Sequence, residues 1–240
     1  MGQIYAMYGY GGFYFDRTYI LIVIGVIISM IASAKVKSTF NKYQRVRSLS
    51  GLTGAQAANE VLRNAGIYDV RIQRVSGHLT DHYDPRNKTL NLSDSVFDST
   101  SCAAIGVAAH EAGHAIQHAR SYLPLQVRNA IVPVVNFGAT LSWPLILLGI
   151  LLSGFHYLIT IGIILFSFAV IFQLITLPVE FNASRRAIQM LSSTGILRGD
   201  EINHTKKVLN AAALTYVAAA AASILQLLRL IILFGGRDRD

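Results

Sequence analysis

Four stretches of the chain are apolar and almost free of charged side chains. They cover residues 20–34, 131–152, 158–177 and 211–234. A helix needs roughly 20 mostly apolar residues to cross a membrane, which the last three stretches provide and the first nearly provides. Because only residues 154–157 separate the second stretch from the third, these two are predicted to form a helical hairpin, kinked at Pro144.

The segment between the first two stretches has the pattern of a small folded domain. A capping box at its start predicts a helix over residues 53–64. Residues 70–75 alternate apolar with polar positions, a second extended piece ends near residue 84, and residues 89–92 form a third. The pattern therefore predicts a short antiparallel sheet, followed by a helix from Cys102 to about Arg120.

Composition separates this chain from soluble proteins. Of its 240 residues, 52% are hydrophobic and 14% are charged, whereas a soluble domain is about 25% charged. This excess excludes a disordered chain and argues against a soluble nucleic-acid-binding protein, despite a net charge of +8. The one cysteine, Cys102, excludes a scaffold held by intrachain disulfides.

The positive charge is concentrated in two segments. Residues 35–130 and 178–207 carry +7 of the net +8. Basic loops of membrane proteins face the cytoplasm, so both segments are predicted there, with the 154–157 loop and the 235–240 tail outside. Topology and attraction to anionic lipid explain the basic residues, and no nucleic acid partner is expected.

The first apolar stretch could alternatively belong to a cleaved signal peptide. Residues 32–34, Ala-Ser-Ala, look like a cleavage site. A signal peptide, however, carries basic residues before its apolar core, whereas here they follow it. A retained membrane anchor is therefore the favoured interpretation.

The helix predicted after the sheet carries the main candidate for chemistry. His110 and His114 are four residues apart, which places them on one helix face, where both could bind one zinc ion at about 2.0–2.1 Å. Glu111 follows the first histidine and could reach a water beside the metal. This is the His-Glu-x-x-His pattern of zinc proteases, with the glutamate as general base. Two unrelated histidines on a helix are the less favoured alternative.

A catalytic zinc ion usually has a third protein ligand. His118 lies two helical turns from His110 and is too far to share its ion, so it is expected to support the site or to face solvent. Glu180 follows the third apolar stretch, where the hairpin returns to the domain. It could simply favour the start of a helix opened by Pro178, but a zinc ion would offset the cost of a carboxylate this close to lipid.

Other residues are candidates without a clear ranking. The developing oxyanion needs a further donor, for which Tyr216, His204, Arg185 and Arg186 are available; membrane-interface packing would explain Tyr216 equally well. A turn-rich stretch before the active-site helix could hold substrate or be ordinary turn structure. Its candidate contacts are Asp81, His82 and Asp84.

Four segments together resemble the YugP-like neutral zinc metallopeptidases, a family of bacterial membrane proteins. They are residues 77–85, 108–117, 178–184 and 213–219, and the resemblance extends from about Ser50 onward. It implies a bacterial membrane protease that uses zinc. More distantly, the chain is similar to the HtpX and CAAX proteases, whose third ligand begins a Glu-x-x-x-Asp motif. Here Ser184 replaces that aspartate, so Ser184 or Asn182 is expected to orient a histidine instead.

These observations predict a mainly α integral membrane protein with about four transmembrane helices and a small α+β zincin-like cytoplasmic domain. The predicted function is a zinc-dependent endopeptidase in the cell membrane, which acts on a peptide or membrane-protein substrate at the cytoplasmic face. The alternative is a non-catalytic scaffold or partner-binding protein with a structural metal. The predicted segments are 1–34 with the first span, 35–130 as the domain, 131–177 as the hairpin, 178–208 with the third ligand, and 209–240 with the last span and tail.

Overall fold

The computed structural model describes residues 16–152 and 154–235. Most of the expected N-terminal segment, residues 1–15, and most of the expected tail, residues 236–240, lie outside this range. In chain order the elements are α1 (Tyr19–Tyr43), α2 (Gly54–Asn64), β1 (Arg71–Val75), β2 (His82–Asp84), β3 (Thr89–Ser93), α3 (Asp94–Phe97), α4 (Cys102–Ala119), α5 (Leu123–Leu151), α6 (Tyr157–Ser193) and α7 (Asp200–Phe234).

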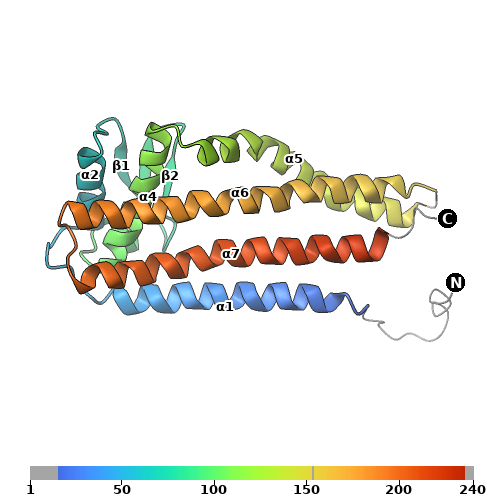
Figure 1. Ribbon diagram of the computed structural model, residues 1–240, viewed down its shortest axis with the longest axis horizontal. Coiled ribbons are helices and arrows are strands. Elements are labelled where there is room, and N and C mark those ends of the chain that lie inside the picture. The colour runs from blue at the N-terminus through green and yellow to red at the C-terminus, as the bar shows by residue number, and fades with distance from the viewer. Residues whose placement is uncertain (1–15, 153, 236–240) are drawn as a thin grey trace.

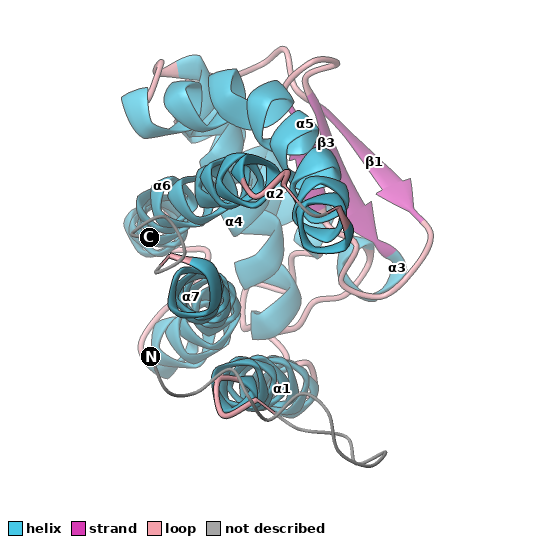
Figure 2. Cartoon of the chain, turned by 90° about the vertical axis from the view of Figure 1, so that its right-hand side faces the viewer, coloured by secondary structure: helices cyan, strands magenta, loops and turns pink. Residues whose placement is uncertain are grey.

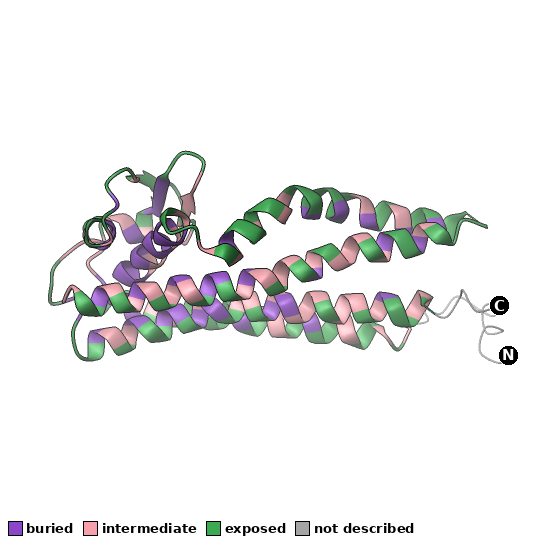
Figure 3. Ribbon diagram, turned by 45° about the horizontal axis from the view of Figure 1, so that its top comes forward, coloured by how far each residue is buried: buried purple, intermediate pink, exposed green. Residues whose placement is uncertain are grey.

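Within the residues that the structure describes, four helices are long and apolar enough to cross a membrane, in agreement with the predicted number. They are α1, α5, α6 and α7, and the mean hydropathy of their most apolar windows runs from 1.8 to 2.6. The four helices run lengthwise, with the small domain at one end (Figure 1). Large apolar side chains along them are exposed, including Ile31, Leu147, Ile164 and Ile232. Buried residues gather instead in the domain (Figure 3).

Helices α5 and α6 form the predicted hairpin but extend beyond its expected ends. Helix α5 contains Pro133 and Pro144 and is visibly bent (Figure 3), as expected when prolines remove backbone hydrogen bonds. Pro178 lies inside α6 and does not begin a helix. The explanation of Glu180 as a carboxylate in the first turn of a helix is therefore wrong.

The sheet is mixed, and the expectation of an antiparallel sheet is wrong. Its strand order is β1-β3-β2. A short turn after Asp84 makes β2 and β3 antiparallel neighbours. Strand β3 then lies between the other two and runs parallel to β1, with Arg71 opposite Thr89. This order leaves β2 at an edge of the sheet, where it contacts α4.

Helix α4 is the central element of the domain. Its N-terminus is capped by Ser101, whose hydroxyl accepts a hydrogen bond from the backbone N–H of Ala104 at 3.1 Å. Small apolar side chains, mostly alanine, let neighbouring helices approach closely, and α4 packs against α2, α6 and α7 (Figure 2). Larger side chains such as Phe40, Leu62 and Leu90 fill the surrounding core.

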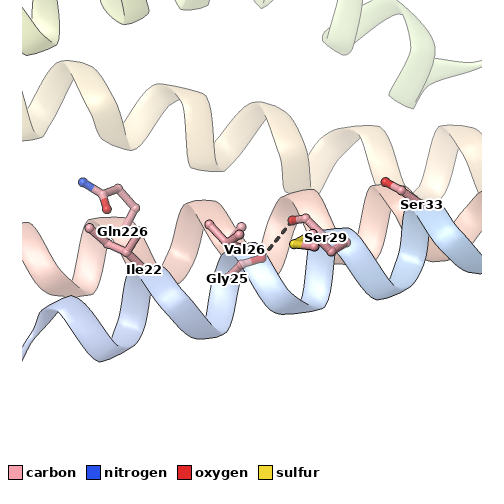
Figure 4. A pocket seen from close by; sticks show the side chains of 8 residues that line it. Ile22, Gly25, Val26, Ser29, Ser33 and Gln226 are labelled. Atoms are coloured by element: carbon pink, nitrogen blue, oxygen red, sulfur yellow. Dashed lines mark hydrogen bonds between the residues drawn. The ribbon is translucent and has the colours of Figure 1, made fainter.

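The first and last spans pack against each other along their length (Figure 1). The contact is tight at Gly25, where an added Cβ would lie 3.3 Å from Cα of Ala222. The Ser29 hydroxyl donates a hydrogen bond to the Gly25 carbonyl oxygen at 2.9 Å (Figure 4). A groove runs between α1 and α7 beside Gly25 and Ser29, and none of the described residues that line it is charged.

Candidate metal centre

Three potential metal ligands converge where α4 meets α6. His110 and His114 come from α4, and Glu180 comes from α6. Oε2 of Glu180 lies 3.3 Å from Nε2 of His110 and 3.5 Å from Nε2 of His114. The candidate ligand atoms of the three residues all lie within 4.8 Å of one another.

The two distances from the Glu180 carboxylate oxygen to the imidazole nitrogens suit a shared zinc ion. Ligand atoms placed 2.0–2.1 Å from a tetrahedral ion lie roughly 3.3–3.4 Å from one another. Two imidazole nitrogens and one carboxylate oxygen are also a ligand set that catalytic zinc uses. The side chains are 13%, 12% and 5% exposed for His110, His114 and Glu180, so they are largely shielded from water.

Hydrogen bonds hold both imidazole rings from the side opposite the cluster. Nδ1 of His114 lies 3.0 Å from Oε1 of Gln117, and Nδ1 of His110 lies 3.1 Å from Oγ of Ser184. Because an amide oxygen only accepts, Nδ1 of His114 carries the proton. Its Nε2 is then free to bind a metal, and the hydrogen bond fixes the ring orientation.

The Gln117 side chain is itself fixed by two further contacts. Its amide nitrogen donates to the Val179 carbonyl oxygen at 2.8 Å and to Oδ1 of Asn182 at 3.0 Å. Oδ1 of Asn182 also accepts from Nε of Arg186 at 2.7 Å. Asn182 therefore lies next to the histidine network and acts through Gln117.

The second carboxylate oxygen of Glu180 has a cationic partner. Nη1 of Arg128 on α5 donates to Oε1 of Glu180 at 3.2 Å. Because a buried carboxylate without a partner is strongly unfavourable, this pair helps to keep Glu180 ionised. Oε2 remains directed toward the two histidines.

Gly113 allows α4 and α6 to lie close enough for this cluster. A Cβ at this position would lie 2.7 Å from the Ala183 carbonyl oxygen, a distance that side chains do not tolerate. The glycine inside the histidine motif therefore sets the distance between the helix of the histidines and the helix of the glutamate.

Glu111 is buried beside the cluster, with 8% of its surface exposed. Loss of solvation raises the pKa of its carboxyl group to about 7. A group that titrates near neutral pH is suited to accept and return a proton.

Two cavities adjoin at Glu111. One is lined by side chains of α1, α4 and α7, and the other by side chains of β2, α5, α6 and α7. They share Asp81, Glu111, Thr215 and Tyr216. Of the residues considered as oxyanion donors, Tyr216 thus lies beside both Glu111 and the cluster.

The structure places other candidates away from the cluster. His118 accepts or donates a hydrogen bond with the Tyr83 hydroxyl at 2.9 Å and, as expected, is not one of the three clustered residues. The His204 ring stacks on Tyr43 with 4.9 Å between ring centroids. Arg185 is exposed on α6, and neither His204 nor Arg185 lines the two cavities.

The turn-rich stretch divides into residues that line the site and residues that shape the backbone. Asp81 and His82 both line the larger cavity. Asp81 accepts hydrogen bonds from the Ser93 backbone and hydroxyl at 2.8 and 2.9 Å, and burial raises the pKa of its carboxyl group. Asp84 instead stabilises the turn by accepting from the Arg86 backbone N–H at 2.9 Å.

Gln117 and Arg128 were not singled out from the sequence. Gln117 lies three residues after His114 on the same helix, a spacing at which side chains meet. Arg128 is a lone charge near the start of a span, where charged residues are usually paired. The spacing of Gln117 and the isolation of Arg128 are visible in the sequence, but neither shows which residue of another helix the side chain contacts.

Comparison with known proteins identifies the family of this chain. The chain matches the model of the family described as "putative neutral zinc metallopeptidase" over residues 18–235. It is 53% identical over 214 residues to a protein of Bacillus subtilis (strain 168) described as "putative membrane protease YugP", covering 89% of this chain and 95% of that protein. No solved structure gives a significant match. The chain belongs to this zinc metallopeptidase family.

Proposed function

We propose that this protein is a membrane zinc endopeptidase with His110, His114 and Glu180 as metal ligands. The observation that carries the proposal is the convergence of their ligand atoms at separations that suit zinc, next to the buried carboxylate of Glu111. The family's description and that of the Bacillus subtilis relative support the same activity.

The proposed reaction is hydrolysis of a peptide bond. A bound zinc ion would supply Lewis-acid polarisation of the scissile carbonyl group and acidify water. Glu111 accepts a proton from the attacking water and delivers it to the leaving amine. The Tyr216 hydroxyl lines the same cavity and is proposed to donate a hydrogen bond to the developing oxyanion.

The substrate is proposed to bind along β2. This strand lies at the edge of the sheet, and Asp81, His82 and Tyr83 line the larger cavity together with Glu111. An edge strand offers unpaired backbone groups to an extended peptide. The charge distribution supports a cytoplasmic position for this domain.

The number of ligands favours catalysis over a purely structural metal. Structural zinc sites usually have four protein ligands, whereas catalytic sites keep one position open. Among residues 16–152 and 154–235, the metal-ligand cluster contains three residues. The scaffold alternative lacks a specific observation in its favour.

The decisive experiment replaces Glu111 with Gln in the full-length protein. We expect bound zinc, measured by elemental analysis, to stay near one ion per chain, while cleavage of an unfolded, dye-labelled casein falls by at least 100-fold. Glu180→Ala should lose most of the zinc, and Glu60→Gln on the α2 surface is the matched control. Unchanged casein cleavage by Glu111→Gln would refute the role of Glu111 as the base.

A further inference from the structure

A second groove lies between α1 and α7, near the end of the spans that carries the domain. Its lining residues are Lys35, Ser38, Thr39, Lys42 and Tyr43 from α1, with Lys207, Asn210, Ala211 and Leu214 from α7. The catalytic cavities share none of these residues. It is therefore separate from the candidate metal centre, although the same two helices contribute to both.

The groove has the charge of an anion site. Of the lining residues within the described part of the chain, three are lysines and none is a carboxylate. All three lysines are exposed. The two hydroxyl groups of Ser38 and Thr39 and the amide of Asn210 add hydrogen-bond donors suited to phosphate oxygens.

The groove begins where the apolar run of α1 ends, the position at which lipid headgroups are expected. Lys35 is the first charged residue after the apolar run of α1. Lys35, Ser38 and Lys42 lie on one face of α1. Toward the centre of the span the same face continues, at spacings of three and four residues, with Ile31, Ile28 and Ile24. Ile31 is 64% exposed and Leu214 on α7 is 46% exposed. A basic pocket thus continues into an exposed apolar surface.

The neighbouring groove between the same helices provides a contrast. It follows Ile22, Val26, Ser29 and Ser33, which lie on a different face of α1 from Lys35. Among the described residues, none of those that line this groove is charged, as Figure 4 illustrates for the residues it labels. Of the described residues that line the two grooves, the charged ones therefore all belong to the groove of Lys35, Lys42 and Lys207.

We propose that the lysine groove binds one anionic glycerophospholipid of the leaflet on the domain side. Its phosphate contacts Lys35, Lys42 and Lys207, and one acyl chain lies over the isoleucines of α1. Basic pockets between membrane helices favour such headgroups through charge and hydrogen bonding. A lipid held there would connect α1 to α7, the helices whose other residues line the catalytic cavity beside Glu111.

The test uses the full-length protein in a neutral detergent. Dioleoyl-phosphatidylglycerol and dioleoyl-phosphatidylcholine are titrated separately, and bound lipids are counted by native mass spectrometry. We expect one retained phosphatidylglycerol. Replacing the three lysines with Gln should weaken its binding by about 100-fold, since each lysine near a lipid surface contributes about fivefold. The triple Lys→Arg variant should bind normally.

The control variant removes the same charge outside the groove. Lys37, Lys88 and Lys206 are replaced with Gln, because none of them lines the groove. Equal weakening in this control, or equal retention of phosphatidylcholine, would overturn the proposal in favour of diffuse attraction. If millimolar inorganic phosphate displaces the lipid completely, the acyl chain contributes nothing and the lipid assignment fails. None of these outcomes depends on the proposed peptidase activity.

Discussion

Two histidines that would serve the same metal are held by different kinds of partner. The amide oxygen of Gln117 can only accept from His114, whereas the hydroxyl of Ser184 can accept from or donate to His110. The buried amide therefore fixes one ring in a single tautomer, and the serine adapts to the other ring. Second contacts of this kind commonly tune metal affinity as strongly as some direct ligands do.

Gln117 should therefore matter for zinc binding even though it does not reach the ion. Replacing it with Leu keeps its volume but removes three hydrogen bonds and leaves the Val179 carbonyl without this donor. We expect zinc affinity, measured with a competing chelator, to fall about 10- to 100-fold. The free energy of unfolding should fall by roughly 1–3 kcal/mol.

The matched control for this prediction is Gln126→Leu. Gln126 is exposed on α5, so the same change in side chain should leave zinc affinity within about twofold of the original protein. Zinc affinity that is unaffected in Gln117→Leu would show that the ring of His114 is oriented without this amide.

At the scale of the element, the α4–α6 contact determines whether the site exists. Gly113 contacts the α6 backbone at Ala183, which lies between Glu180 and Ser184 on that helix. The close approach thus occurs within one helical turn of both the proposed ligand and the serine that contacts His110.

Gly113→Ala should separate the two helices. Alanine favours a helix by about 1 kcal/mol over glycine, but the added methyl would meet the Ala183 carbonyl oxygen at 2.7 Å. Overpacking typically costs about 1–3 kcal/mol, so we expect no net stabilisation and at least a tenfold loss of zinc affinity. Ala119→Gly, at the exposed end of α4, changes helix propensity without this contact and should keep its zinc affinity. A more stable Gly113→Ala protein with normal zinc binding would contradict the packing argument.

Local sequence patterns predicted most helices and strands, whereas contacts between elements far apart in the chain could not be predicted from the sequence. Apolar run length gave the four spans, and the motif spacing placed two ligands on one face of α4. The alternation of apolar and polar residues predicts strands but not the order in which they pair. The mixed sheet, with β3 between β1 and β2, therefore could not be predicted from it. The orientation of α6 about its axis likewise could not be predicted, although it buries Glu180 and leaves Arg185 exposed. The cation that pairs with Glu180 is Arg128, which comes from α5.

At the scale of the molecule, the proposed metal would join the domain to the membrane-spanning helices. The histidines belong to α4, which is not one of the candidate spans, and the glutamate belongs to α6, which is one. A ligand that binds only the folded state stabilises it by mass action.

Removal of zinc should consequently lower the thermal stability of the entire protein. At zinc concentrations about 1,000 times the dissociation constant, binding contributes roughly 4 kcal/mol. Chelation should lower the melting temperature by about 8–16 °C, given the size of the chain. Glu180→Ala should show little response to the chelator. An equal shift in that variant would indicate that the metal binds elsewhere.

The proposed topology can be tested with single cysteines in intact cells. Cys102 is fully buried, and burial raises the pKa of its thiol to about 11, so it should not react. A membrane-impermeant maleimide should label His156→Cys in the α5–α6 turn but not Arg63→Cys on α2 until the cells are opened. The unmodified chain is the background control. Labelling of Arg63→Cys in intact cells would show that the domain faces the outside, opposite to the proposed orientation.

The division of the cluster between α4 and α6 also has a consequence for synthesis of the protein. A growing chain that has emerged only as far as α5 contains both histidines and Glu111 but not Glu180. The proposed metal site is therefore completed only after the third span has been made and has folded back against the domain. The growing chain would therefore remain without the proposed peptidase activity until that point.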